Sequence, residues 1–377
     1  MGKRFDSWAE VDLGAIQHNI HEISRYAGKP VIAIIKANAY GHGMIPVAKA
    51  ALAAGCPFLA VARFSEALQL RLAGITAPVL VLGLISPSDV EQAAREKIRG
   101  TLFSWKQLQA YEAALAPLAY SGSKLPVHVK VDIGMGRLGL QAEEALPFLQ
   151  RALQSPALDV EGLFSHFSKA DMLEDSATDQ QFSRFDQLVR EADQNGIRPK
   201  FVHLANSAGA IFHSNICKYD LVRGGIAIYG LDPSDTAVLP EGFRPALSWK
   251  AGITSIKTVR AGQEISYCGR YQVKQDHARI GVAAVGYADG MCRRLGNFMM
   301  VHGKKVPVLG TVCMDQCMID LNDVPQAQVG DEAVLIGFQE GSRISAEELG
   351  ESWGTINYDV VCGIASRVQR IYQPETL

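Results

Sequence analysis

A lysine and a cluster of small polar residues follow directly on a short apolar run near the start of the chain. Residues 31–43 read V-I-A-I-I-K-A-N-A-Y-G-H-G, so five apolar residues lead straight into Lys36. A short, β-branched run closed by glycines is typical of a fully buried strand. Lys36 is then expected at the carboxyl end of that strand. Its amine is there either a surface cation or a nucleophile made reactive by its removal from water.

Polar residues that could join Lys36 follow four further apolar runs. They are Lys130, Asp132, Arg137, Ser165, His166, Ser168, His203, Asn206, Ser207, Arg223, Gly224 and Gly225. Taken singly, His166 reads as a structural histidine, the arginines as ion-pair partners and Asn206 as a helix cap. In a parallel barrel, however, the carboxyl ends of the strands meet at one face. The convergence of five strand ends therefore favours a binding or catalytic site.

Two glycine-containing segments could hold a phosphate. G-M-G-R-L-G at 134–139 matches a dinucleotide fingerprint, but no acidic residue follows about 20 positions later in a matching strand–helix unit, so we do not expect a dinucleotide site. The helix start at Asn206 and Ser207, with Gly224 and Gly225 after the next strand, suits a phosphate better. A strand-end lysine, a phosphate site and an arginine suggest pyridoxal phosphate. An aldolase that uses Lys36 alone is the weaker alternative, since it would need no partner for a cofactor ring.

Short apolar runs alternate with helical patterns up to residue 231. Strands are predicted at 31–35, 58–62, 79–82, 101–103, 126–131, 158–164, 200–204 and 219–222. Helices are predicted at 11–26, 44–54, 64–73, 87–96, 105–115, 142–153, 177–195 and 207–212. This alternation predicts an α/β fold with a (β/α)8 TIM-like barrel, with a doubly wound open sheet as the alternative.

The pattern changes after residue 231. Residues 232–244 read as a linker, and short strands with turn signals follow at 248–259, 279–285, 298–301, 305–308, 318–321 and 332–336. We therefore expect a barrel domain over 11–240 and a mostly β C-terminal domain over 241–377, with residues 1–10 packing on the latter.

Composition limits the possible partners. The chain has 377 residues and a net charge of −2, which gives no reason to expect nucleic acid or an anionic membrane as a partner. No apolar run approaches the roughly 20 residues of a membrane span. The seven cysteines are odd in number and scattered, which favours reduced thiols and a cytoplasmic protein.

Nine motifs in a fixed order carry a resemblance to a known family. They are W-A-E-V-D-L-G-A-I-Q-H-N from Trp8, A-I-I-K-A-N-A-Y-G-H-G from Ala33, K-V-D-I-G-M-G-R-L-G from Lys130, S-H-F-S-K-A-D from Ser165, A-N-S-A-G from Ala205, V-R-G-G-I-A-I-Y-G from Val222, G-Y-A-D-G from Gly286, C-M-D-Q-C-M from Cys313 and T-I-N-Y from Thr355. Over almost its whole length the chain resembles the bacterial alanine racemases, a barrel-type (fold type III) family that depends on pyridoxal phosphate.

The resemblance implies a reaction and an assembly. L-alanine and D-alanine would be interconverted by two bases, supplying D-alanine for peptidoglycan. Lys36 would carry the cofactor as an N6-pyridoxal phosphate lysine and act as one base, and Tyr267 would act on the opposite face of the substrate. In the family that tyrosine comes from the other subunit, so a homodimer with shared active sites is expected.

The resemblance also implies binding residues. The cofactor would be held by Lys36, Tyr40, Arg137, His166, Asn206, Ser207, Arg223, Gly225, Ile226 and Tyr358. The substrate would meet Arg137, Met314, Asp315 and Tyr287, with Arg367 beside Tyr287 at the entrance. Lys130 matches a position where many relatives carry an N6-carboxylysine. No metal is expected, because Cys313 and Cys317 lack a second Cys or His pair at zinc spacing.

Arg223 would face the ring nitrogen of the cofactor, with a chemical consequence. Arginine can only donate hydrogen bonds, so the ring nitrogen would stay unprotonated. The ring would then be a weaker electron sink. Side transamination should then be disfavoured, and Arg223→Glu should raise it. Free lysine and tyrosine both titrate near 10, so Tyr267 would need a lowered pKa to act as a base. A hydrogen-bond chain through His166 towards Arg223 is expected to supply this.

Three other functions share part of this pattern of residues. A pyridoxal phosphate carrier can be a lone barrel, and the added β domain with Tyr267 argues against it. A barrel-type amino-acid decarboxylase is disfavoured by Arg223 at the ring nitrogen. A racemase for serine or for a broad set of amino acids stays open, because Tyr267 is followed by Cys-Gly-Arg where many relatives have Gly-Ala-Thr.

Overall fold

A computed structural model describes residues 4–121 and 124–373. Contacts divide the chain into two compact units. The barrel unit comprises Ala15–Ala39 and Met44–Arg244. The strand unit comprises the described parts of Met1–Gly14, Tyr40–Gly43 and Pro245–Leu377. The domain bounds expected from the sequence, 11–240 and 241–377, stay a prediction.

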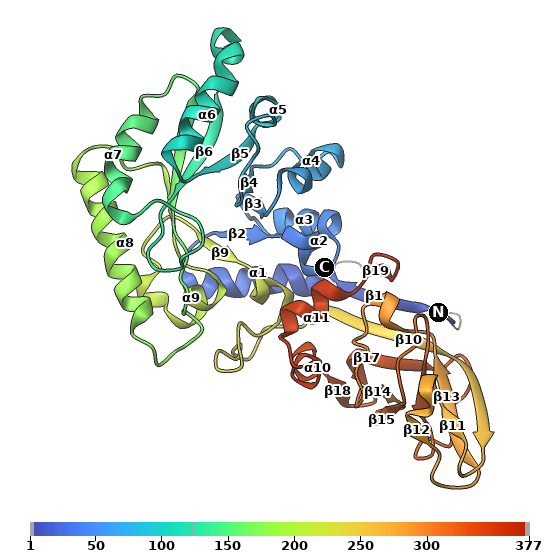
Figure 1. Ribbon diagram of the computed structural model, residues 1–377. Coiled ribbons are helices and arrows are strands. Elements are labelled where there is room, and N and C mark those ends of the chain that lie inside the picture. The colour runs from blue at the N-terminus through green and yellow to red at the C-terminus, as the bar shows by residue number, and fades with distance from the viewer. Residues whose placement is uncertain (1–3, 122–123, 374–377) are drawn as a thin grey trace. The chain divides into compact units, whose positions relative to one another are not determined.

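The barrel unit is built on eight parallel strands (Figure 1). They are β2 (Val31–Ile34), β3 (Phe58–Val61), β4 (Val79–Val81), β5 (Ile98–Leu102), β6 (Leu125–Lys130), β7 (Leu158–Phe164), β8 (Phe201–His203) and β9 (Val222–Gly224). Their order is β8-β7-β6-β5-β4-β3-β2-β9, and a parallel bridge between His203 and Leu221 joins the two edges of the sheet. The predicted α/β barrel followed by a mostly β domain is therefore confirmed.

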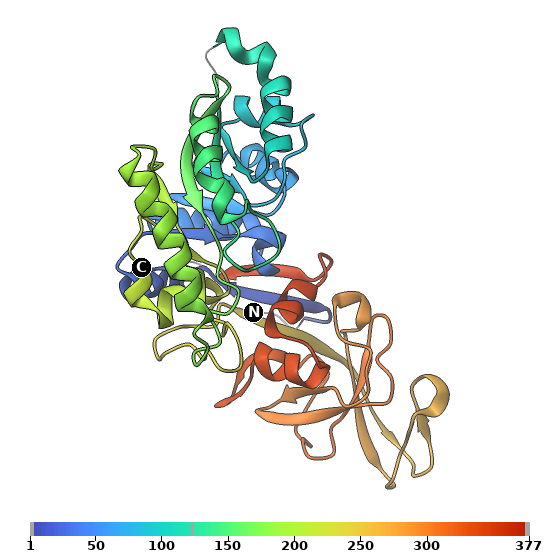
Figure 2. The same cartoon turned by 60° about the vertical axis from the view of Figure 1, so that its left-hand side comes forward.

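Helices follow most of these strands on the outside of the sheet, as Figures 1 and 2 show. They are α3 (Met44–Ala53), α4 (Phe64–Leu72), α5 (Val90–Arg95), α6 (Trp105–Leu115), α7 (Ala142–Leu153), α8 (Ala177–Gln194) and α9 (Ser207–Phe212). Helix α1 (Leu13–Ala27) precedes β2, and α2 (Lys36–Tyr40) is a short turn whose φ and ψ values are not those of a right-handed helix. The strands read as continuous apolar runs because both faces of a barrel strand are buried. Ile32, Leu59 and Leu80, for example, have no exposed surface.

Two predicted elements are wrong in position. The helix predicted at 11–26 begins at Leu13, because Ser7–Asp12 forms strand β1. The eighth barrel strand is Val222–Gly224 rather than 219–222, because Val222 and Arg223 pair with Val31 and Ile32 of β2. Arg223 and Gly224 therefore lie within the strand and not after it.

The strand unit is a mostly antiparallel sheet of nine strands in the order β18-β17-β14-β15-β16-β13-β10-β1-β19. They are β1, β10 (Leu247–Val259), β13 (Ala278–Ala283), β14 (Phe298–Val301), β15 (Lys304–Leu309), β16 (Cys317–Asp320), β17 (Glu332–Gln339), β18 (Ser342–Ile344) and β19 (Gln369–Gln373). The two-stranded sheet β11 (Glu264–Ile265) and β12 (Tyr271–Gln272), and the helices α10 (Ala346–Trp353) and α11 (Asn357–Gly363), complete the unit.

Strand β10 organises this sheet. Its first half pairs with β1 on one side and β17 on the other, and its second half pairs with β13. The extra β10–β17 pairing closes a ring with β14, β15, β16 and β13. Irregularities at Trp249/Lys250 and Ile253/Ser255 let one strand change partners, as bulges do in curved sheets.

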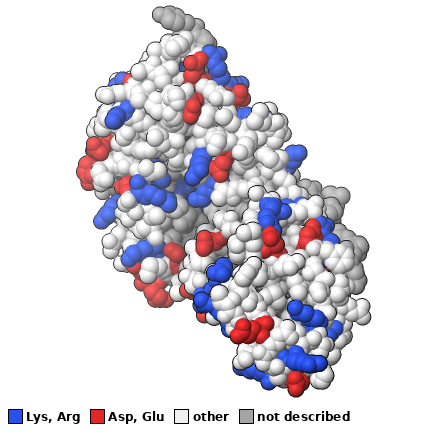
Figure 3. All heavy atoms as spheres, turned by 45° about the vertical axis from the view of Figure 1, so that its right-hand side comes forward, with Lys and Arg blue, Asp and Glu red and all other residues white. Residues whose placement is uncertain are grey.

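On the face in Figure 3, Lys and Arg side chains alternate with Asp and Glu, without one continuous field of either sign. None of the helices in the described residues has the length and apolar composition needed to cross a bilayer.

Candidate active site

Lys36 follows β2 and begins an unusual turn. Ala37, Asn38, Ala39 and Tyr40 have φ values of 52°, 54°, 55° and 50°, so four consecutive residues other than glycine adopt the left-handed conformation. This conformation costs roughly 1–2 kcal/mol for each L-residue. Such strain persists only where the surrounding structure holds it.

Two bonds to side chains and one backbone bond hold the turn. The N–H of Ala39 donates to the carbonyl of Ile35 at 2.9 Å. The N–H of Ala37 donates to Oε1 of Glu66 at 2.7 Å. Oδ1 of Asn38 accepts from the N–H of Met44 at 2.8 Å, which ties the turn to the start of α3.

Lys130 lies at the end of β6 among other cations. Burial, and after it the positive charges of Arg223 and Arg137, lower the pKa of its amine from 10.5 to about 8. Lys36 adds to this effect and Asp132 opposes it. The carboxyl ends of the strands therefore hold an excess of positive charge, which suits an anionic ligand.

Arg223 is a buried residue of β9 and donates to five acceptors. They are Nδ1 of His203 at 3.0 Å, Nδ1 of His166 at 3.0 Å, and the carbonyl oxygens of Ser165 at 2.7 Å, Leu204 at 2.8 Å and His203 at 3.2 Å. None of these five is a carboxylate. Burial and then the charge of Arg137 lower the pKa of Arg223 to about 9, which still leaves it a cation at neutral pH.

The two histidines bonded to Arg223 are neutral acceptors. Burial, followed by the charge of Arg223, lowers the pKa of both His166 and His203 well below 6.5. Since arginine only donates, each must present an unprotonated Nδ1 to it. The bond between His166 and Arg223 is one part of the expected hydrogen-bond chain, and its continuation from His166 to Tyr267 stays a prediction.

A second polar chain leads from His203 through the barrel interior. Nε2 of His203 lies 2.9 Å from Nδ1 of His128, and Nε2 of His128 lies 3.3 Å from Oε1 of Glu161. Arg99 donates to the same carboxylate oxygen at 2.7 Å. The two ends of this chain fix the direction of its hydrogen bonds. Arg223 can only donate to His203, and the Glu161 carboxylate can only accept from His128. Each of the two histidines therefore carries its proton on Nε2.

The expected phosphate segment has a defined geometry. Oδ1 of Asn206 caps α9 by accepting from the N–H of Gly209 at 2.9 Å. Asn206 is therefore a helix cap, as its sequence position alone also suggests. The hydroxyl of Ser207 accepts from the N–H groups of Gly225 at 2.9 Å and Ala227 at 3.4 Å. Ile226 is buried beside them and begins a short 3-10 helix.

Other predicted residues belong to the strand unit. The ring of Tyr40 is buried and lies 6.1 Å from that of Tyr358, centroid to centroid. Tyr267 lies between β11 and β12, and 64% of its surface is exposed. Met314 is also exposed, at 53%. These two side chains extend into solvent with little support from their own unit.

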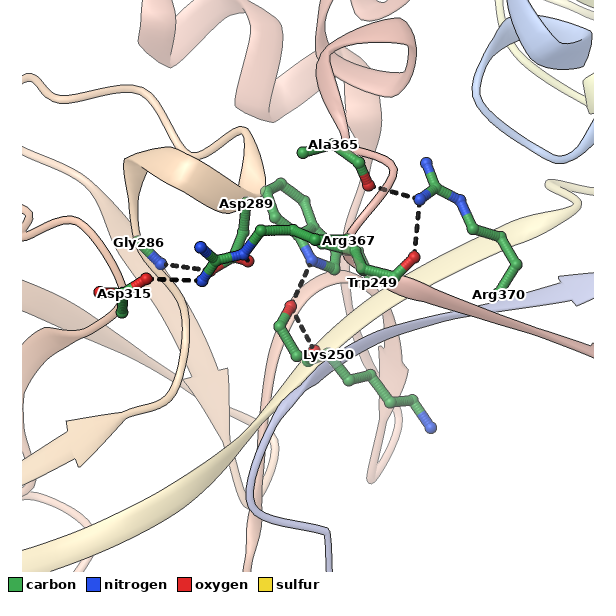
Figure 4. A network of polar contacts seen from close by, with 10 residues as sticks. Trp249, Lys250, Gly286, Asp289, Asp315, Ala365, Arg367 and Arg370 are labelled. Carbon is green, nitrogen blue, oxygen red and sulfur yellow. Dashed lines mark hydrogen bonds and ion pairs between the residues drawn. The ribbon is translucent and has the colours of Figure 1, made fainter.

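Arg367 joins two acidic residues of the strand unit, as Figure 4 shows. Its Nε donates to Asp289 at 2.8 Å and its Nη2 to Asp315 at 2.7 Å. Asp289 in turn accepts from the N–H of Gly286 at 2.9 Å. Tyr287, the next residue, is partly exposed and donates its N–H to the carbonyl of Cys313 at 3.0 Å.

The predicted residues thus fall into two groups. The barrel unit holds Lys36, Lys130, Arg137, His166, Asn206, Ser207, Arg223, Gly225 and Ile226, and the strand unit holds Tyr40, Tyr267, Tyr287, Met314, Asp315, Tyr358 and Arg367. Arg137 is exposed at the barrel end, near enough to Lys130 and Arg223 to affect their titration.

Sequence reasoning missed Glu66, His128 and Glu161. Glu66 reads as an ordinary residue of the first turn of a helix. His128 and Glu161 lie in strands whose other residues are mostly apolar, with Lys130 and Asp159 as the exceptions. A charged residue within such a run was the only signal available, and it does not reveal the partner.

Comparisons with known proteins identify relatives over both units. The family model "Alanine racemase, N-terminal domain" matches residues 11–233, and "Alanine racemase, C-terminal domain" matches 246–372. An alanine racemase of Symbiobacterium thermophilum is 42% identical over 373 residues, covering 98% of each chain. One of Desulforamulus reducens is 43% identical, covering 97% of this chain and 98% of the other.

A solved structure has the same fold. The crystal structure of alanine racemase from Bacillus anthracis with bound L-Ala-P matches with a TM-score of 0.91 and 40% sequence identity. The match covers 99% of this chain and 96% of that one.

Proposed function

The chain belongs to the alanine racemase family, and from this premise we propose that it interconverts L-alanine and D-alanine with pyridoxal phosphate as cofactor. The single observation that carries the cofactor is the group of cations at the barrel end. Arg223, Arg137 and Lys36 lie close enough to Lys130 for their charges to lower the pKa of its amine. Asp132 is the only acid among the residues that shift it.

The residues at the barrel end fit this anionic cofactor. Lys36 supplies an amine for its aldehyde. Ser207 and the backbone at Gly225 and Ile226 would supply polar groups for its phosphate, and the family resemblance implies Tyr40 and Tyr358 of the strand unit as further phosphate ligands. Arg137 supplies a charge for its phenolic oxygen. When bound, the cofactor withdraws electrons from the α-carbon of the amino acid and so acidifies the α-proton.

Arg223 retains one donor for the cofactor ring. Its Nη1 and Nη2 already serve five acceptors, so Nε–H is the donor that the described residues leave available. A donor there keeps the ring nitrogen unprotonated, because a guanidinium does not give up its proton. The residue therefore favours return of the proton to the α-carbon over transamination.

Lys36 and Tyr267 would exchange the α-proton, one on each face of the substrate. The Lys36 amine removes or returns it on one face, and the Tyr267 phenol does so on the other. Arg137, Met314, Asp315 and Tyr287 would bind and admit the substrate. The 64% exposure of Tyr267 supports a place for it in another subunit, so we propose a homodimer with shared active sites.

Lys130 is proposed to be carboxylated. An amine with a pKa of about 8 is partly neutral near physiological pH, and only a neutral amine adds carbon dioxide. The addition forms an N–C bond and releases a proton. It turns a cation into a carbamate anion, which replaces repulsion from Arg137 by attraction.

We place this activity in the cytoplasm, where D-alanine would be made for peptidoglycan. The test is chiral analysis of products from purified protein and a panel of L-amino acids that includes serine, with and without added pyridoxal phosphate. Racemisation of alanine that requires the cofactor supports the proposal. Racemisation of other amino acids at equal rates would favour the broad-spectrum alternative, and no racemisation would refute both.

A further inference from the structure

We propose that Glu66 is a positioning residue for Lys36. Its carboxylate holds the backbone that follows the lysine in the left-handed turn, and this directs the Lys36 amine. The inference rests on the proposed function, in which that amine bonds to the cofactor. It adds a residue that makes no contact with cofactor or substrate in that scheme.

The turn needs support from outside itself. Ala37 is the first of its four left-handed residues and directly follows Lys36. Its N–H donates to Oε1 of Glu66, 29 positions later in the chain. This bond therefore fixes the first peptide after Lys36 in its strained conformation.

The second oxygen of Glu66 bonds elsewhere. Oε2 accepts from the N–H of Ala62 at 2.8 Å and of Arg63 at 2.9 Å, at the junction of β3 and α4. The carboxylate thus ties the loop after β2 to the loop after the neighbouring strand. Among the described residues no cation forms an ion pair with it, so both oxygens serve backbone groups.

Helix capping alone does not account for this arrangement. Glu66 occupies the third position of α4, where a carboxylate commonly bonds back to the N-cap N–H. The bond to Arg63 performs that function with one oxygen. The bond to Ala37 lies outside the helix. A shorter side chain could therefore still cap α4 while no longer holding the N–H of Ala37.

Glu66→Asp separates them. Aspartate keeps the charge and can cap α4, but it is one methylene too short to reach Ala37 as well. Glu66→Gln is the second variant, since it keeps the length and loses the charge. Glu144→Gln is the matched control, because Glu144 is at the third position of α7 and has no bond to the Lys36 loop.

The measurement is attachment of pyridoxal phosphate to the full chain. The Lys36 amine and the cofactor aldehyde join with loss of one water. Borohydride then reduces the C=N bond, and mass spectrometry of peptides locates the label. We expect Glu66→Asp to slow labelling of Lys36 about tenfold or more, as for other misplaced groups, while its urea midpoint stays near that of Glu144→Gln.

A further variant tests the cause. Glycine has no penalty at positive φ, so Ala37→Gly should restore part of the labelling rate in the Glu66→Asp chain. A capping defect in α4 would not respond to a change at residue 37. Labelling of Glu66→Asp at the wild-type rate, or no recovery with Ala37→Gly, would overturn the inference alone. A wild-type chain that is not labelled at Lys36 would instead refute the proposed cofactor.

Discussion

Arg223 shows how a buried cation is kept in a barrel without a carboxylate beside it. Five neutral acceptors surround its two terminal nitrogens, and the nearest negative charge along the hydrogen-bond chain is Glu161, two histidines away. Burial would raise the pKa of Glu161, but hydrogen bonds from His128 and Arg99 lower it overall. A proton cannot pass through this chain, because the guanidinium does not release one. Its effect is orientation and polarisation.

The single residue Lys130 makes the free energy of unfolding depend on pH. Its pKa is lowered to about 8 in the folded chain, whereas the unfolded chain keeps a value near 10.5. Between these values the unfolded chain binds more protons, so this residue makes the free energy of unfolding rise with pH. Below about pH 8 the folded chain carries the whole cost of the buried charge.

We therefore expect Lys130→Met to be more stable than the wild type near pH 7 in buffer free of carbon dioxide, by roughly 1–3 kcal/mol. The difference should shrink between pH 8 and 10.5. Urea unfolding at several pH values measures it, with Lys106→Met on the exposed face of α6 as control. A difference that stays constant over this range would show that the charge of Lys130 is not responsible.

At the scale of elements, the loop before β16 is held against a short 3-10 turn at Tyr287–Asp289. A Cβ atom on Gly286 would lie 2.2 Å from the carbonyl oxygen of Met314, which no carbon contact allows. The φ of Gly286 is −146°, which any residue can adopt. A larger residue is therefore excluded here by the close approach of Met314 and not by the backbone conformation.

Gly286→Ala should displace Met314 and Asp315, and we expect KM for alanine to rise about tenfold as the substrate groups move. Overpacking of this kind costs about 1–3 kcal/mol of stability. Gly363→Ala is the control, because nothing lies within 4 Å of a Cβ there. Steady-state kinetics and urea unfolding of both variants distinguish the two effects. An unchanged KM in Gly286→Ala would show that Met314 and Asp315 do not meet the substrate.

The elements also show what the sequence could predict. Short apolar runs bounded by turns located seven of the barrel strands, because burial on both faces leaves a continuous signal. The predicted position of the eighth strand was displaced from the observed one. Pairing with β2, and not the apolar pattern of the strand itself, decides where that strand lies. The left-handed turn carries no sequence signal, because Ala37 and Ala39 are ordinary helix formers. Only the bonds from Glu66 and Asn38 reveal it.

At the scale of the whole molecule, the proposed site needs residues from two chains. Mixing the inactive variants Lys36→Ala and Tyr267→Ala tests this directly. If sites are shared, the mixed dimer has one intact site and one doubly altered site. Random reassociation should then restore about a quarter of wild-type activity. If each chain carries its own site, every site keeps one defect and the mixture stays inactive, as does each variant unmixed.

Strand β1 has a consequence for synthesis on the ribosome. Its partners β10 and β19 lie roughly 240 and 360 residues later in the chain. At about 5–20 residues per second, β1 waits about 10–70 s for them. Trp8, Ala9 and Val11, which end up buried, remain exposed on the nascent chain during that time. The first of the described strands to leave the tunnel is thus among the last to be paired, and a chaperone that binds short apolar segments has a long opportunity there.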